Sequence, residues 1–158
     1  MRRTTIPGVT LALAIAASTA LAQSSDTFTA YLDWVPISGA ERNDVTGRGS
    51  ATAKLSRSQL EISGCFAALP AAATRASLHQ GVATGARGPV IAELTIAHNA
   101  DGTFNGAVEL DREQRAALLA GHLYIQLHSE RGVAPDGATL WGWLLTNQRA
   151  APDRCAAR

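Results

Sequence analysis

GHLYIQLHSERGVAPDGATLWGWLL, residues 121–145, reads as two strands joined by a turn-rich loop. Apolar and polar side chains alternate over residues 122–128, which is the period of a strand with one buried face. Residues 129–139 are rich in glycine, proline and aspartate, the residues that favour turns. The segment TLWGWLL, residues 139–145, is rich in aromatic and branched side chains and predicts the return strand.

The rest of the chain carries the same kind of pattern. Short alternating segments separated by turn signals predict six further strands, at residues 28–35, 47–55, 59–67, 75–80, 90–97 and 104–110. One short connector helix is expected, with Asp111 as N-cap, Gln114 completing a capping box and Gly121 just past its end. Because few connections are long enough for parallel crossovers, the sequence predicts an all-β, mainly antiparallel sandwich or barrel.

The first 22 residues have the layout of a secretory signal peptide. Arg2 and Arg3 form a basic start, residues 6–17 are mostly apolar, and Ala20-Leu21-Ala22 is a small-x-small cleavage site. The apolar run is too short for a permanent anchor, so no membrane span is expected after cleavage. We predict a periplasmic or secreted protein, exported by general secretion or by the twin-arginine route. An ordinary amphipathic N-terminal helix is the alternative.

Length and charge bound the remaining possibilities. The chain has 158 residues, enough for one domain, which we assign to residues 23–146, with a C-terminal tail at residues 147–158. It carries 14 basic and 13 acidic side chains, and signal cleavage leaves 12 against 13. This near-neutral balance gives no electrostatic case for nucleic acid or acidic membranes as partners. Proteins and small molecules remain as possible partners.

Two cysteines survive signal cleavage, Cys65 and Cys155. In an exported protein two cysteines are expected to pair, which would tie the tail to a central strand. The closed loop of about 90 residues would stabilise the fold by on the order of 4 kcal/mol in the chain-entropy model. The alternative is a buried thiol at Cys65 and a free thiol at Cys155.

Several segments together resemble CHRD domains, the repeated modules of the developmental protein chordin that also occur singly in exported bacterial proteins. The resemblance covers residues 27–145. Its most specific parts are Ala-x-x-His-x-Gly at residues 76–81 and Gly-x-Leu-Tyr-x-x-x-His-Ser at residues 121–129. The other matching segments are TGRGSATAKLS (46–56), LEISGCFAALPAAATRASLHQG (60–81), GPVIAEL (88–94) and GATLWGWLL (137–145).

The resemblance implies an exported Greek-key β-sandwich or barrel, similar in outline to Cu/Zn superoxide dismutase, and no particular activity. The sequence departs from the family pattern at two places. Ser77 replaces the first histidine of the usual Ala-His-x-His run, and residues 137–142 lack the charged pair of the usual closing strand. A dismutase site fails on count, because the four histidines are too few for a copper shell and a separate zinc shell.

His79 and His128 are the candidate metal ligands. Each lies opposite the apolar face of its segment, and if the two strands are neighbours the imidazoles could approach one another. With a third ligand from His122 or from a carboxylate they would suit copper or zinc. The alternative is structural: a histidine at a strand end that bonds a loop carbonyl and fixes the loop. Copper or zinc is the only cofactor that the sequence suggests.

Trp141 and Trp143 alternate with smaller apolar residues, so one set of side chains faces away from the core. An exposed tryptophan pair would form a recognition surface for a protein or carbohydrate partner. The alternative is that the tail or the helix covers the pair. Catalytic or phosphate-binding motifs do not occur in the sequence. We therefore predict a non-catalytic binding module of unknown partner, with a copper- or zinc-binding protein as the alternative.

Overall fold

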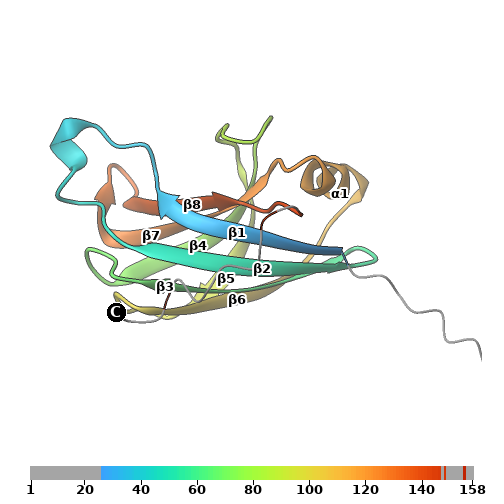
Figure 1. Ribbon diagram of the computed structural model, residues 1–158, viewed down its shortest axis with the longest axis horizontal. Helices are drawn as coiled ribbons and strands as arrows, with labels where there is room; N and C mark the ends of the chain where they lie inside the picture. Colours follow the sequence, from blue (N-terminus) through green and yellow to red (C-terminus); the bar gives the residue numbers. More distant parts are fainter. Residues whose placement is uncertain (1–25, 147, 149–154, 156–158) are drawn as a thin grey trace, which may run out of the picture.

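The computed structural model describes residues 26–146, 148 and 155 of the chain (Figure 1). The predicted signal peptide at residues 1–22 lies outside the described residues, as does most of the predicted tail at residues 147–158. The elements are β1 (Asp26–Trp34), η1 (Gly39–Glu41), β2 (Arg48–Ser56), β3 (Gln59–Ala67), β4 (Ala73–Gln80), β5 (Val90–Ile96), β6 (Gly102–Glu109), α1 (Arg112–Leu119), β7 (Leu123–Val133) and β8 (Ala138–Trp143).

The strands close into an antiparallel barrel with the order β1-β2-β3-β6-β5-β4-β7-β8. Most neighbouring strands share long ladders, but the β5–β6 and β1–β8 seams consist of two residue pairs each. The barrel is therefore close to a sandwich of two sheets that meet at two short seams, as Figure 1 shows. The predicted antiparallel Greek-key sandwich or barrel is confirmed.

The predicted strand boundaries lie within two residues of the observed ones, with one exception. The segment 59–67 coincides with β3, whereas β7 runs on to Val133, well past the predicted end at His128. In this extension Ser129 pairs with Ala73 of β4 and, after a register shift, Val133 pairs with Ala138 of β8. The predicted loop at residues 129–139 was therefore too long, and its glycine and proline residues cluster near the tip.

Inward side chains of all eight strands fill the barrel. The inward residues of β7 are Leu123, Ile125 and Leu127, and each is fully buried. Fully burying one such side chain is worth roughly 1.5–3 kcal/mol. Where two large residues would collide the sequence has glycine: a Cβ at Gly64 would lie 2.2 Å from Cζ of Phe104. Because side chains pack the interior, a binding surface has to form on the outside of the barrel.

The connector helix α1 closes one end of the barrel and begins as predicted. The Asp111 side chain accepts the Gln114 N–H at 2.8 Å, and the Gln114 side chain accepts the Asp111 N–H at 3.0 Å. Ala117 and Leu118 face the core, and Gly121 follows the C-cap with a φ of 74°. Among the described residues no helix has the length and apolar character needed to cross a membrane.

The predicted pairing of the cysteines is confirmed: Cys65 and Cys155 form a disulfide with a Cα–Cα distance of 6.0 Å. Cys65 lies in β3, on the face opposite the inward Ile62 and Phe66, so the bond fixes residue 155 against the outside of the barrel. The cross-link spans 90 residues of sequence. It therefore removes a large loop from the unfolded chain.

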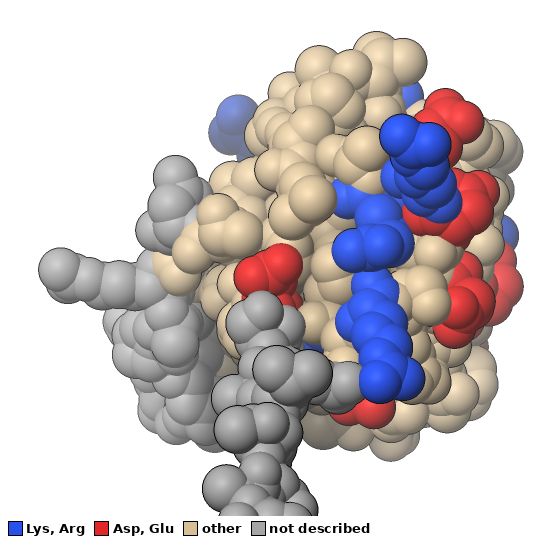
Figure 2. All heavy atoms as spheres, turned by 90° about the vertical axis from the view of Figure 1, so that its right-hand side faces the viewer, with Lys and Arg blue, Asp and Glu red and all other residues tan. Residues whose placement is uncertain are grey.

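The surface charge fits the near-neutral composition. Figure 2 shows a short row of basic side chains at the barrel end that carries α1, with acidic side chains directly beside it. Charges of both signs that adjoin in this way cancel at distance, so this end does not present an extended field of one sign.

One prediction about β7 was wrong. The alternation at residues 122–128 predicted one buried face, but Tyr124, Gln126 and His128 on the opposite face are buried as well, at 1%, 5% and 1% exposure. A strand in a barrel wall ordinarily has a solvated outer side. Neighbouring strands and loops must therefore cover the outer side of β7. These covering groups and the outward side chains of β7 form the candidate site.

Candidate functional site

The outward side chains of β4, β7 and β8 form one continuous surface, which we call the β4–β7–β8 face. Its members come three from each strand: Arg75, Ser77 and His79; Tyr124, Gln126 and His128; Thr139, Trp141 and Trp143. The strand register sets them in rows across the sheet. One row is His79, Tyr124 and Trp143, the next is Ser77, Gln126 and Trp141, and a third brings Arg75 opposite His128.

His79 anchors the loop between β4 and β5, which projects from the barrel at the top of Figure 1. Its Nδ1 lies 3.0 Å from the carbonyl oxygen of Gly88, and its Nε2 lies 2.9 Å from Oγ of Ser77. Because a carbonyl oxygen only accepts, Nδ1 carries the proton and the Ser77 hydroxyl donates to Nε2. The Tyr124 hydroxyl bonds both backbone groups of Gly88, at 3.1 and 3.2 Å. Two buried side chains thus hold one loop residue.

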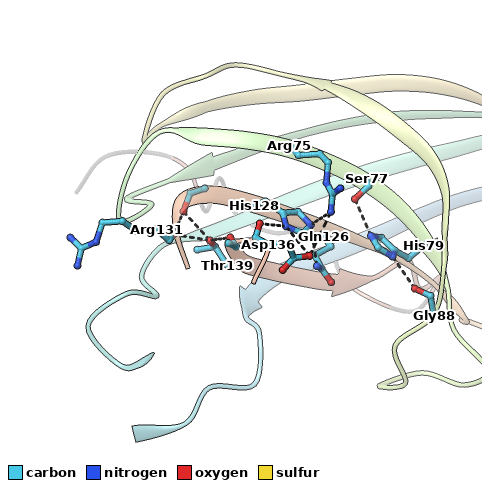
Figure 3. Close-up of polar contacts among 11 residues, drawn as sticks. Arg75, Ser77, His79, Gly88, Gln126, His128, Arg131, Asp136 and Thr139 are labelled. Carbon is cyan, nitrogen blue, oxygen red and sulfur yellow. Dashed lines mark hydrogen bonds and ion pairs between the residues drawn. The ribbon is translucent and has the colours of Figure 1, made fainter. Parts of the chain in front are cut away.

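His128 anchors the tip of the β7–β8 hairpin in the same way (Figure 3). Its Nδ1 donates to the carbonyl oxygen of Asp136 at 3.0 Å. Its Nε2 accepts from the Arg75 guanidinium and from the Gln126 amide, both at 3.1 Å. The Asp136 carboxylate lies 3.7 Å from the guanidinium and 3.5 Å from Nδ1. The imidazole is therefore held neutral between a cation, an amide and a carbonyl.

The surroundings of both histidines disfavour the charged imidazole. Burial is the largest influence and lowers the pKa of His79 and of His128 below the ordinary value of 6.5. The hydrogen bonds to Gly88 and Asp136 act in the opposite direction, since they stabilise a protonated Nδ1. The nearby Arg75 charge lowers the pKa of both further. The net direction is downward, and both side chains are neutral at pH 7.

These contacts bear on the predicted metal site at His79 and His128. Their strands are neighbours, but His79 lies opposite Tyr124 and His128 opposite Arg75, so the two histidines are four residues out of register, about 13 Å along the strands. A metal at His128 Nε2 would have to displace a guanidinium cation. Among the residues that the structure describes, three His, Cys, Asp or Glu side chains nowhere group to hold a metal ion. Metal binding here stays a prediction without a supporting contact.

An aromatic cluster occupies the other end of the face. Tyr124 stacks between the His79 ring at 4.8 Å and the Trp143 ring at 5.0 Å. Trp141 meets Trp143 edge-on at 4.5 Å and 70°, and the Arg87 guanidinium lies 5.5 Å from the Trp141 ring centroid. Such contacts are worth about 0.5–1.5 kcal/mol each beyond area burial. The cluster is thus a fixed array of rings.

Trp141 and Trp143 are neither fully exposed nor fully buried. Both side chains are partly buried, and the loop between β4 and β5 supplies Arg87 against Trp141. Trp34 is more exposed, at 48%, and its Nε1 donates to the Gly47 carbonyl oxygen at 3.0 Å. The predicted tryptophan pair therefore keeps part of its surface accessible, although other groups pack around it.

A concave pocket of about 330 Å³ opens beside the pair. Its lining residues are Tyr31, Asp33, Thr84, Trp141, Gly142, Trp143, Leu145 and Gln148. Two of these residues each have a buried side-chain atom with no hydrogen-bond partner among the described residues: Nε1 of Trp143, a donor, and the side-chain oxygen of Gln148, an acceptor. The aromatic floor, the unpaired donor and the unpaired acceptor together make this pocket the candidate binding site.

Sequence reasoning missed several residues of this site. Tyr31 and Asp33 belong to β1 and reach the pocket because the barrel closes between β1 and β8, with Asp33 opposite Trp141. Thr84 and Arg87 lie in the glycine-rich segment 81–89, which read only as a loop. The outward placement of Tyr31 and Asp33 was visible in the alternation of residues 28–35, but the neighbour they face was not.

The family described as CHRD domain matches residues 33–138, about two thirds of the chain. The match includes all of β4 and β7, and it ends before Trp141 and Trp143. No curated protein and no solved structure matches the chain. The chain belongs to the CHRD domain family.

Proposed function

We propose that this CHRD domain is an exported, non-catalytic binding module whose partner docks at the aromatic end of the β4–β7–β8 face. The observation that carries the proposal is the pocket of about 330 Å³ floored by Trp141 and Trp143. This size is at the lower end of the range for small-molecule sites. Large, rigid tryptophan side chains also supply most of the binding energy at many interfaces.

The fold supports a binding role because it holds the pocket rigid. Trp141 and Trp143 lie on β8, a strand that pairs on both sides, with β7 and with β1. The loop beside them is fixed by the His79 and Tyr124 contacts to Gly88 and by the Thr84 hydroxyl, which donates to the Gly121 carbonyl oxygen at 2.8 Å. A rigid site loses little conformational entropy on binding.

The contacts of His128 support the non-catalytic part of the proposal. The imidazole of His128 has both nitrogens engaged, one with a carbonyl and the other with two donors, so its lone pair is not free to accept a substrate proton. Export is supported by the signal-peptide pattern at residues 1–22 and by the disulfide, because such bonds persist mainly in oxidising compartments.

Affinity capture from an envelope extract of the source organism tests the proposal. The wild-type protein, the double variant Trp141→Ala/Trp143→Ala and the control Trp34→Phe would be immobilised after circular dichroism has shown that each is folded. We expect the wild type and the Trp34→Phe control to retain the same component, and the double variant to lose it. Equal retention by all three proteins, or no retention at all, would refute docking at this face.

A further inference from the structure

We infer that the ligand of the Trp141–Trp143 pocket is a neutral saccharide; this identification rests on the proposed function and makes it specific. The first reason is that two lining side chains each carry an unpartnered polar atom, the Nε1 donor of Trp143 and the side-chain oxygen of Gln148. Both atoms are buried in this structure, so a ligand reaches them only when these side chains adjust on binding. A sugar hydroxyl both accepts and donates a hydrogen bond, and pairing with either atom would then remove the cost of leaving it unpaired.

The second reason is the combination of shape and ring surface. A pyranose has an apolar C–H face and a rim of hydroxyl groups, which matches a pocket with an aromatic floor and a polar wall. The floor rings are Trp141 and Trp143, and the wall carries Asp33, Thr84 and Gln148. A cavity of about 330 Å³ accommodates a ligand of one or two rings.

The third reason concerns charge. Asp33 places a carboxylate in the wall, and the Arg87 guanidinium lies over the Trp141 ring. The charged groups beside the pocket therefore carry both signs, and they favour neither an anionic nor a cationic ligand. A neutral, hydroxyl-rich ligand suits such a wall.

The fourth reason separates a saccharide from a peptide. Extended peptides commonly bind by adding a strand to a free sheet edge. Here β8, which carries both tryptophans, has β7 on one side and β1 on the other, and Leu145 continues the pairing by a bridge to Thr29. Because β1 pairs with β8 on either side of Trp143, β8 offers no free edge for main-chain pairing beside the pocket.

The test is calorimetric titration of the full mature protein with five neutral hexasaccharides, namely cellohexaose, laminarihexaose, xylohexaose, mannohexaose and chitohexaose, and with an anionic oligogalacturonide. We expect saturable binding of at least one neutral sugar. The variant Trp143→Phe keeps a ring but loses the donor, and Gln148→Ala loses the acceptor, so each should weaken binding roughly 3–10-fold. Trp141→Ala should weaken it more than tenfold, and Trp34→Phe should leave it unchanged.

The outcomes separate this inference from the proposed function. If no neutral sugar binds at millimolar concentration while the Trp141-dependent capture from envelope extract persists, the saccharide is wrong and the binding face stands. If that capture also fails, both are wrong. Preference for the oligogalacturonide would overturn the neutral assignment. Neutral-sugar binding that survives in Trp143→Phe, Gln148→Ala and Trp141→Ala would place the ligand elsewhere and overturn the inference.

Discussion

The buried histidines predict an acid sensitivity that can be measured as a slope of stability against pH. Both His79 and His128 are neutral in the folded protein, and burial, their largest influence, lowers the pKa of each below 6.5. In the unfolded chain they titrate near the ordinary value. The native state therefore binds fewer protons, and its stability falls as pH drops below about 6.5. Above that pH the contribution of the two histidines is fully present.

The size of the effect follows from linkage. The ordinary pKa of 6.5 in the unfolded chain limits the loss of unfolding free energy between pH 7.5 and pH 5.5 to about 1.4 kcal/mol for one histidine and about 2.7 kcal/mol for two. His128 should contribute strongly, because protonation would change its Nε2 from an acceptor into a donor. That donor would face two other donors, the Arg75 guanidinium and the Gln126 amide. Its side chain is 1% exposed, so solvent cannot compensate locally.

The assay is urea unfolding at half-unit steps between pH 7.5 and pH 5.5. The double variant His79→Asn/His128→Asn keeps an N–H near each loop carbonyl but does not titrate, so we expect a flatter slope at whatever absolute stability it has. Trp34→Phe changes no titratable group, so it is the control and should keep the wild-type slope. A wild-type slope of zero, or the same slope in the double variant, would refute the assignment of buried neutral histidines.

Three further predictions concern the Cys65–Cys155 disulfide, the helix α1 and the metal-binding alternative. The double variant Cys65→Ala/Cys155→Ala should lose about 4 kcal/mol of unfolding free energy in urea titrations, because it releases a loop of 90 residues in the unfolded chain; a loss below 1 kcal/mol would contradict a stabilising cross-link. Asp111→Ala removes the N-cap of α1 and should cost about 1 kcal/mol in thermal unfolding, whereas an unchanged midpoint would mean that the cap is dispensable. Calorimetry with copper or zinc should show no saturable uptake, since His128 Nε2 already accepts two hydrogen bonds. Uptake that disappears in His79→Asn/His128→Asn would restore the metal-binding alternative.

The sequence predicted the strands because their period is a local property. Alternation identified Leu123, Ile125 and Leu127 as inward, and these three are fully buried. The helix cap at Asp111 depends on residues three apart and was equally readable. The disulfide followed from cysteine count and the expected compartment, without any knowledge of geometry.

The candidate site depends on long-range pairing and was only partly readable. The register of β4 against β7 places His79 opposite Tyr124, and a shift of four residues would have placed it opposite His128. Nothing in either segment specifies this register locally, because it follows from how the whole barrel closes. The burial of the outer face of β7 likewise depends on loop 81–89, whose contacts with His79 and Tyr124 join residues far apart in sequence.

The most direct test of the binding face is an indole N–H spectrum of the 15N-labelled protein during titration with the component captured from envelope extract. The chain has three tryptophans, and two of them line the pocket while Trp34 does not. The proposal predicts that the indole signals of Trp141 and Trp143 shift and saturate together, while the Trp34 signal stays in place. Binding that moves the Trp34 signal alone, or that leaves all three signals unchanged, would contradict a partner site on the β4–β7–β8 face.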